Sequence, residues 1–268
     1  MTAISAIISK DWISVASDSL LTEISGNSVK HIEFKKSKIV PIQKFKASAA
    51  YWGLAKVGNW RTYDFLKIMA CDAEKFLSFE SFANHVYNEL NTKLASINVN
   101  NPTDKGIGIH LAGFEEFEGE KLPELFLISN YSNTSYNEIK PLDISRNLYG
   151  TIKDEFKNGE NTLDEKRRKV REHLSNGHVF IFNNGDPQLF NPSAKAITEI
   201  FINAANRNVL KDKHLNAYLK LASNPIKIIK MAQQDLFKKE HIRIGGQIHD
   251  LLITKEGLMI SNTGDNKI

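Results

Sequence analysis

The residue with the most distinctive chemistry is the second in the chain. Thr2 becomes the N-terminal residue if Met1 is removed, which the small side chain at position 2 permits. A hydroxyl is a weak nucleophile near neutral pH, but an α-amine with a pKa of roughly 7.7–8.0 is partly unprotonated there and can accept the hydroxyl's proton. Thr2 would then carry both a nucleophile and its base. The simple alternative is that Thr2 only follows the start of translation.

Asp18 is the first candidate partner for Thr2. Residues 3–8 and 12–17 are two β-prone runs with three residues between them, a pattern that predicts an antiparallel hairpin. A three-residue loop sets Thr2 opposite Asp18 on the same face of the sheet, whereas a shift of one position would send Asp18 to the other face. The alternative is a turn residue, because Ser17-Asp18-Ser19 is turn-prone.

Lys38 is the second candidate partner. It stands where a polar stretch gives way to the apolar pair Ile39 and Val40, which is why we prefer it to Lys35 or Lys36. A lysine that is partly desolvated there would have a lowered pKa, useful for proton transfer. The alternative is a solvated lysine on an edge strand, where it would discourage the addition of further strands.

Gly53 follows a small-residue strand at 47–51 and precedes a helical pattern that begins near Gly58 or Asn59 and includes Trp60. A glycine between a strand and a helix lets backbone N–H groups face outward, as an oxyanion hole requires. It is equally suited to an ordinary turn.

Composition limits the remaining possibilities. With 268 residues, 41% hydrophobic and 25% charged, the chain has the make-up of a globular protein with a substantial core, and a net charge of +4 does not indicate nucleic acid. Its single cysteine, Cys71, rules out an internal disulfide and fits a reducing cytosol. No signal peptide or membrane-spanning run is visible, so we expect a cytoplasmic protein. The eight histidines show no ligand spacing and no phosphate-binding glycine loop occurs, so we expect neither a metal nor a cofactor.

The apolar patterns predict an α+β fold. Their order is four strands, two helices, two strands, a charged region without a clear period at about 130–178, one strand, two helices and two strands. The charged region includes a helix opened by a capping box at Thr162, whose Lys166–Lys169 run we interpret as a solvated face and not as a nucleic-acid site. Asn191-Pro192 and Asn224-Pro225 are expected to begin the later helices. Two sheets with helices outside them follow from this order.

These residues together resemble proteasome β-type subunits, members of the N-terminal-nucleophile hydrolases, and the simple start is similar to that of HslV-type peptidases. The resemblance covers nearly the whole chain except residues 130–178. It rests on the following segments: Met1-Thr2, Ser17-Asp18-Ser19, Lys38-Ile39-Val40, Ala49 to Gly53, His110 to Phe114, Gly245 to Ile248 and Leu252 to Gly257.

The resemblance implies one domain over residues 1–268, with an insertion at about 130–178, folded as a four-layer αββα sandwich of two mainly antiparallel sheets. It also implies a threonine peptidase that forms homo-oligomeric rings or stacks and acts on peptides or unfolded proteins, with any ATPase partner left open. Thr2 would attack, Asp18 would orient it, Lys38 would lower the pKa of its hydroxyl, and the backbone near Gly53 would hold the oxyanion.

The sequence also departs from this family. A serine-containing turn is replaced by residues 182–186, where Asn183, Asn184 or Asp186 could substitute, and an aspartate and a serine are replaced by His241 and Ile244. Two further functions therefore stay open. One is a ring subunit of the same fold without peptidase activity, and the other is an amidase or acylase of the same class that acts on small molecules.

Overall fold

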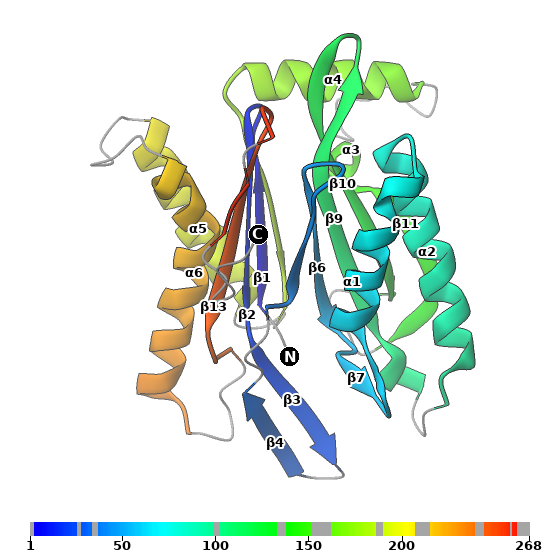
Figure 1. Cartoon of the computed structure of the whole chain (residues 1–268). Helices are drawn as coiled ribbons and strands as arrows, with labels where there is room; N and C mark the ends of the chain where they lie inside the picture. Colours follow the sequence, from blue (N-terminus) through cyan, green and yellow to red (C-terminus); the bar gives the residue numbers. More distant parts are fainter. Residues whose placement is uncertain are drawn as a thin grey trace.

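The computed structural model describes residues 3–25, 28–33, 37–98, 102–132, 138–151, 162–185, 190–206, 215–238, 244–257 and 259–261. These residues form four layers, in which two five-stranded antiparallel sheets lie face to face with helices on both outer sides (Figure 1). The predicted α+β sandwich with helices outside is confirmed.

The first sheet contains the N-terminal hairpin. Its strands run in the order β12 (Phe180–Asn184), β1 (Ile4–Ile8), β2 (Trp12–Asp18), β13 (Ile248–Thr254) and β14 (Met259–Ser261). Every residue of β1 is buried, because one face of this sheet packs on the second sheet and the other face packs on helices. Burial on both faces explains why β1 is a nearly continuous apolar run and does not alternate with polar residues.

The second sheet faces the first across a shared core. Its strands run in the order β11 (Ile139–Arg146), β10 (Glu120–Tyr131), β9 (Ile107–Phe117), β6 (Ala47–Gly53) and β5 (Ile39–Ile42). Successive residues of β6 point to opposite sides: Ala50 and Trp52 enter the core between the sheets, whereas Ala49 and Tyr51 enter the core under the helices.

Two pairs of helices complete the outer layers (Figure 1). Helices α1 (Thr62–Asp72) and α2 (Phe79–Ser96) cover the second sheet, and α5 (Phe190–Asn206) and α6 (Leu215–Leu236) cover the first. Helix α2 begins with a reciprocal capping box, in which the Ser78 and Ser81 hydroxyls each accept a hydrogen bond from the other residue's backbone N–H, at 3.1 and 3.3 Å.

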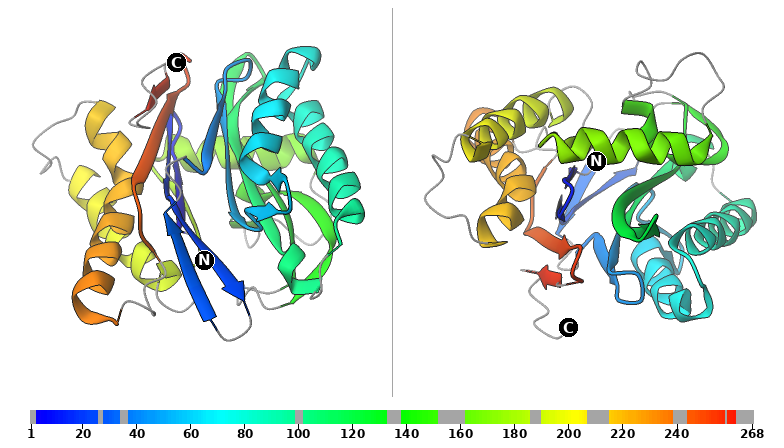
Figure 2. Two further views of the ribbon diagram at one scale, coloured as in Figure 1. Left: turned by 60° about the horizontal axis from the view of Figure 1, so that its bottom comes forward. Right: turned by 90° about the horizontal axis from the view of Figure 1, so that it is seen from above.

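Smaller elements lie at the two ends of the sandwich. The β3–β4 hairpin projects beyond one end, and α4 runs across the strand direction at the opposite end (Figure 2). These elements are β3 (Leu20–Ser25), β4 (Ser28–Glu33), β7 (Lys56–Val57), β8 (Trp60–Arg61), α3 (Asn147–Thr151), α4 (Leu163–Ser175) and the 3-10 turns Ala73–Lys75 and Pro102–Lys105.

Three predictions about local structure need correction. Trp60 belongs to the β7–β8 ribbon, and the helix begins only at Thr62. Pro225 lies inside α6, which begins ten residues before it at Leu215, because packing on the first sheet outweighs the loss of one helical hydrogen bond. The segment without a clear period contributes β11, the edge strand of the second sheet, whose side chains are mostly exposed or half-buried and therefore carry a weak apolar signal.

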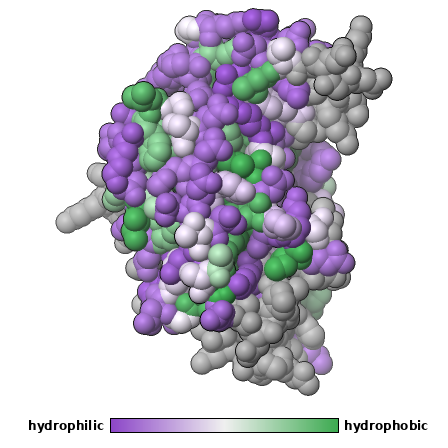
Figure 3. Space-filling model, turned by 90° about the vertical axis from the view of Figure 1, so that its right-hand side faces the viewer, coloured by the Kyte–Doolittle hydropathy of each residue, from purple (hydrophilic) through white to green (hydrophobic). Residues whose placement is uncertain are grey.

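The side of the molecule that carries α1 and α2 is mainly hydrophilic, with apolar residues in small groups (Figure 3). No helix within the described residues is long and apolar enough to cross a membrane.

Candidate active site

Asp18 meets the residue after Thr2, and the predicted register is wrong by one position. Ile8 pairs with Ile13, so Ala3 and not Thr2 lies opposite Asp18. The reason is that the turn between the two strands has two residues between its ends, and three were expected. The Ser9 N–H donates to the carbonyl of Trp12 at 2.9 Å, and the Ser9 hydroxyl accepts from the N–H of Trp12 at 3.1 Å, which gives a four-residue turn.

The carboxylate of Asp18 is fully buried and both of its oxygens are occupied. Oδ1 accepts from the Ala3 N–H at 3.0 Å and from Lys38 Nζ at 2.9 Å, and Oδ2 accepts from the Gly245 N–H at 3.1 Å. The Asp18 N–H donates to the Ala3 carbonyl at 3.0 Å. Asp18 is therefore not a turn residue: it ties the amide that joins residues 2 and 3 to a lysine and to a distant loop.

Lys38 is fully buried, directly before the first residue of β5, and is not a solvated edge lysine. Its ammonium donates to Asp18 Oδ1 and, at 2.7 Å, to the carbonyl of Leu20. Burial lowers the pKa of Lys38, and the Coulombic attraction and hydrogen bond of Asp18 oppose that shift in part. The structure thus joins two of the predicted residues, from separate sheets, in one buried ion pair.

Gly245 and Gly246 also belong to this cluster. The local sequence pattern did not predict that they would. Besides the N–H that reaches Asp18, the Gly245 carbonyl accepts from the backbone N–H groups of Ser19 and Leu20, at 3.3 and 3.2 Å. Gly246 has φ +68°, and a Cβ there would lie 2.4 Å from the Ser19 hydroxyl, which accepts from the Gln247 N–H at 2.8 Å. The sequence signal for this position was the pair of glycines directly before β13, the strand that pairs with β2.

Gly53 ends β6 at the same end of the sheet as Lys38, whose carbonyl accepts from the Tyr51 N–H at 3.3 Å. Its φ is +82°, and a Cβ there would lie 2.3 Å from both the Gly106 carbonyl oxygen and the Tyr131 hydroxyl. Gly53 therefore has a structural reason to be glycine, and its part in an oxyanion hole stays a prediction.

Other residues of interest fall in two groups. Thr2, Asp186 and His241 lie outside the described residues. Asn184 lies in β12 opposite Ile4, and the Ile244 N–H donates to the side-chain oxygen of Gln233 at 3.1 Å. Within the described ranges, no group of three or more histidine, cysteine or acidic side chains could hold a metal ion.

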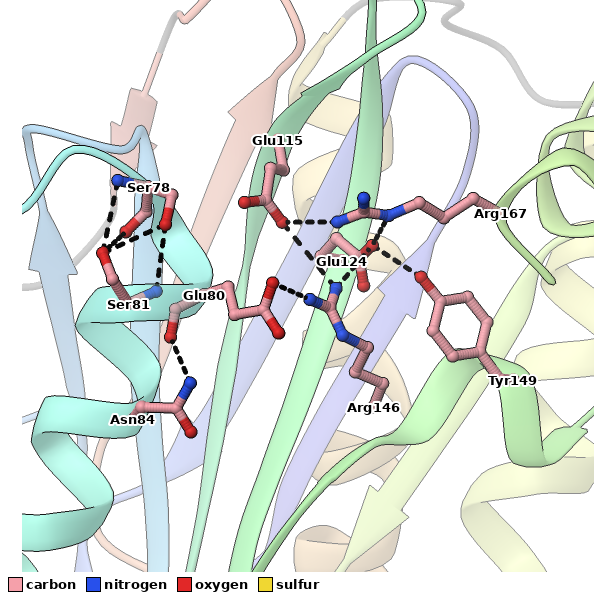
Figure 4. A network of polar contacts seen from close by, with 9 residues as sticks. All are labelled: Ser78, Glu80, Ser81, Asn84, Glu115, Glu124, Arg146, Tyr149 and Arg167. Atoms are coloured by element: carbon pink, nitrogen blue, oxygen red, sulfur yellow. Dashed lines mark hydrogen bonds and ion pairs between the residues drawn. The ribbon is translucent and has the colours of Figure 1, made fainter. Parts of the chain in front are cut away.

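A second buried ionic cluster lies at the other end of the second sheet (Figure 4). Glu124 is 1% exposed, and its Oε1 contacts Arg146 at 3.0 Å, Arg167 at 3.2 Å and the Tyr149 hydroxyl at 2.7 Å. Glu115 contacts Arg167 at 3.1 Å, and Glu80 of α2 contacts Arg146 at 2.5 Å.

This cluster corrects the interpretation of the Lys166–Lys169 run as a solvated face. Arg167 is only 13% exposed and joins α4 to β9 and β10, while the next residue, Arg168, binds Glu118. Charged side chains of α4 therefore form ion pairs with the sheet as well as facing solvent.

A pocket of about 300 Å³ lies beyond this end of the strands, between the β5–β6 turn and the start of α2. Phenylalanines and lysines line it, but the Lys255 and Lys44 ammonium groups already pair with Asp11 and Glu74. It lies at the opposite end of β5 from Lys38 and is not part of the candidate active site.

No family model matches the chain, and no curated protein matches it. Its fold is similar to those of several solved proteins. Against the Gly-1 mutant of Anbu from Hyphomicrobium sp. strain MC1, the TM-score is 0.50 at 11% identity, over 100% of this chain and 90% of that chain. Against Anbu (ancestral beta-subunit) from Yersinia bercovieri, it is 0.49 at 12% identity, over 99% and 88%.

Against Thiobacillus denitrificans BPH in complex with epoxomicin, the TM-score is 0.45 at 11% identity, over 95% of this chain and 98% of that chain. The likeness to the Hyphomicrobium structure shows that this chain shares the fold of Anbu. It does not single out the HslV-type peptidases.

Proposed function

We propose that this chain is a threonine peptidase of proteasome type, whose nucleophile is Thr2 after removal of Met1. The observation that carries the proposal is the buried Asp18–Lys38 pair, held at 2.9 Å against the amide that follows Thr2. Perturbed, paired ionisable groups are typical of functional sites.

In the proposed reaction, the Thr2 hydroxyl oxygen attacks the carbonyl carbon of the scissile peptide bond and its proton passes to the α-amine of Thr2. The tetrahedral intermediate collapses when that amine returns the proton to the leaving nitrogen, which leaves an ester between Thr2 and the acyl part of the substrate. Water then adds to the ester, and its proton takes the same route through the amine. The cycle restores Thr2 and needs no external cofactor.

The two buried charges have separate roles in this proposal. Lys38 stabilises negative charge that develops on the Thr2 oxygen and so lowers the pKa of the hydroxyl. Asp18 holds the Lys38 ammonium and the amide between residues 2 and 3 in fixed positions, which keeps the nucleophile oriented. Backbone N–H groups near Gly53 would hold the oxyanion.

The proposal includes peptides or unfolded proteins as substrates, a cytoplasmic location and a homo-oligomer. The single cysteine supports the location. Four apolar side chains of α5 and α6 are exposed, and we assign association to this side because a partner would cover them. They are Ile200 at 65%, Ile228 at 43%, Met231 at 61% and Leu236 at 78% exposed.

The test combines intact mass with an epoxyketone peptide, a reagent that needs both a hydroxyl and a free α-amine on one residue. Wild-type protein should lack Met1, hydrolyse a fluorogenic peptide and gain one reagent mass on Thr2. Thr2→Ala should lose hydrolysis and labelling, while Thr2→Ser, which keeps both groups, should retain part of each. Active protein that still carries Met1 would overturn the mechanism.

Two other outcomes point to the rival functions. Protein that has lost Met1 but neither hydrolyses peptides nor accepts the reagent would be an inert subunit of this fold. A monomer by light scattering that accepts the reagent and cleaves only small amides would favour an amidase or acylase.

A further inference from the structure

His110 joins the two sheets close to the candidate active site. It lies in β9 between Ile109 and Leu111, and its buried ring enters the core between the sheets, where it meets Trp52 edge to face at 5.0 Å. Its Nε2 lies 2.8 Å from the side-chain nitrogen of Asn184. Because Asn184 belongs to β12 of the first sheet, this contact crosses the core of the sandwich.

The contact has a defined direction. Burial lowers the pKa of His110 to about 3, so the ring is neutral at any pH at which the protein would work. Since the Asn184 nitrogen is a donor, Nε2 must accept and Nδ1 carries the proton. Nδ1 has no hydrogen-bond partner among the described residues. A buried unpartnered nitrogen opposes folding, so an apolar residue would serve stability better than histidine at this position.

Asn184 connects this contact to the start of β1. In the β1–β12 pairing Asn184 lies opposite Ile4, and Ile4 follows Ala3, whose N–H binds Asp18. The first residues of β1 are therefore held by both neighbouring strands. Asp18 holds them from β2, and Asn184, fixed by His110, holds them from β12.

We infer that His110 is a positioning residue that acts through Asn184 to fix the start of β1, and with it Thr2. This inference rests on the proposed function for its catalytic consequence. The mechanical part, that the Nε2 contact fixes Ala3 and Ile4, can be measured without any activity.

Two substitutions separate the hydrogen bond from the bulk of the ring. His110→Gln places an acceptor where Nε2 lies, whereas His110→Asn places one where Nδ1 lies and cannot reach Asn184. Both are polar amides of similar chemistry, so they form a matched pair. His85→Asn, the same change in a histidine of α2 on the far side of the second sheet, is the control.

Residue-level amide hydrogen exchange on the full chain measures the mechanical part. Exchange at Ala3 and Ile4 should quicken by about tenfold in His110→Asn and stay near the wild-type rate in His110→Gln and in His85→Asn. Equal exchange in wild type and a folded His110→Asn would overturn the inference. An equal rise in both His110 variants would assign the effect to ring packing and would also overturn it.

Epoxyketone labelling and peptide hydrolysis measure the catalytic part. His110→Asn should lower kcat and the maximal labelling rate by about 10- to 100-fold with KM little changed, since a misplaced nucleophile slows chemistry more than binding. His110→Gln should restore most of the rate. A loss confined to KM would contradict a positioning role.

Asn184→Leu tests the same bond from its other side and covers the case in which His110→Asn fails to fold. It removes the donor and keeps the branching and number of side-chain heavy atoms, so Ala3 and Ile4 should exchange as fast as expected for His110→Asn. Wild-type exchange and labelling in Asn184→Leu would overturn the inference. If wild-type protein shows no hydrolysis or labelling, the proposed function has failed, and the exchange results still decide whether His110 fixes β1.

Discussion

The two buried ionic clusters of this molecule are built on different plans. Among the described residues Asp18 has one cation, Lys38, and backbone N–H groups also bind its carboxylate. Glu124 has two guanidinium groups and a tyrosine hydroxyl on one oxygen, while its other oxygen has no hydrogen-bond partner among the described residues.

The two clusters differ in how many contacts remain when one is lost. Within the part of the chain that the structure describes, Asp18–Lys38 has no second cation that could replace the first, and it contacts the backbone at the very start of β1. The Glu124 cluster shares its charges among β9, β10, β11, α2 and α4, so loss of one contact leaves others in place (Figure 4). We therefore expect the first cluster to control chemistry and the second to hold the layers together.

Substitution of Lys38 should give the largest effect. Lys38→Met keeps most of the side-chain volume but leaves Asp18 buried without its cation, which costs about 3–5 kcal/mol of stability. Turnover should fall below detection even at temperatures where the variant is folded. Peptide hydrolysis and urea unfolding of the same sample measure the two effects. Turnover near the wild-type rate would remove Lys38 from the mechanism.

Substitution of Glu124 should affect stability alone. Glu124→Gln removes the central charge yet keeps an oxygen that can accept from Tyr149, so we expect a loss of about 1–3 kcal/mol in urea unfolding. The hydrolysis rate per folded molecule should not change. A drop in kcat at full folding would break the distinction between the two clusters.

The same comparison explains how much the sequence could predict. Asp18 and Lys38 were recognisable because each lies directly at the boundary of an apolar run, and the strands beside them follow from local patterns. The contact of Asp18 with Gly245 was not, because these residues are 227 positions apart in the chain and meet only because β13 lies next to β2. The role of Arg167 was hidden for a similar reason, since its partners lie in two distant strands.

The error in the hairpin register has a local cause. Strand patterns specify which residues alternate, but the turn decides which residues face one another. The Ser9 hydroxyl accepts a hydrogen bond from the Trp12 N–H and closes a turn with two residues between its ends, one fewer than expected. The helix start marked by the capping box at Thr162 was the easiest boundary, whereas Pro225 misled because packing sustains α6 through it.

The pH dependence of activity should sharpen the assignment of Lys38. Hydrolysis should rise with deprotonation of the Thr2 amine and fall when Lys38 loses its proton. Because burial lowers the Lys38 pKa, the fall should begin below its ordinary value of 10.5. Lys38→Arg, if it folds, should move the falling limb to higher pH, since a guanidinium keeps its proton. An unchanged limb would assign it to another group.

The smallest effect expected concerns Glu115 and Glu118 in the second region. Their contributions to stability should change with pH in opposite directions. Burial, and then the charge of Glu124, raise the pKa of Glu115, so the folded state binds its proton more tightly than the unfolded chain does. Stability from this group is therefore present below the ordinary pKa of 4.5 and is lost as pH rises through the folded value.

Glu118 is the matched opposite case. Its hydrogen bond from Arg168 lowers its pKa, so its contribution is present above 4.5 and is lost as pH falls. Urea unfolding between pH 3 and 7 of wild type, Glu115→Gln and Glu118→Gln should therefore give difference profiles of opposite slope. Added salt should flatten only the Glu118 profile, because that pair is exposed and the Glu115 carboxylate is largely buried. Two profiles of the same slope would mean that Glu115 is solvated like Glu118, and the contrast between a buried cluster and a surface pair would not hold.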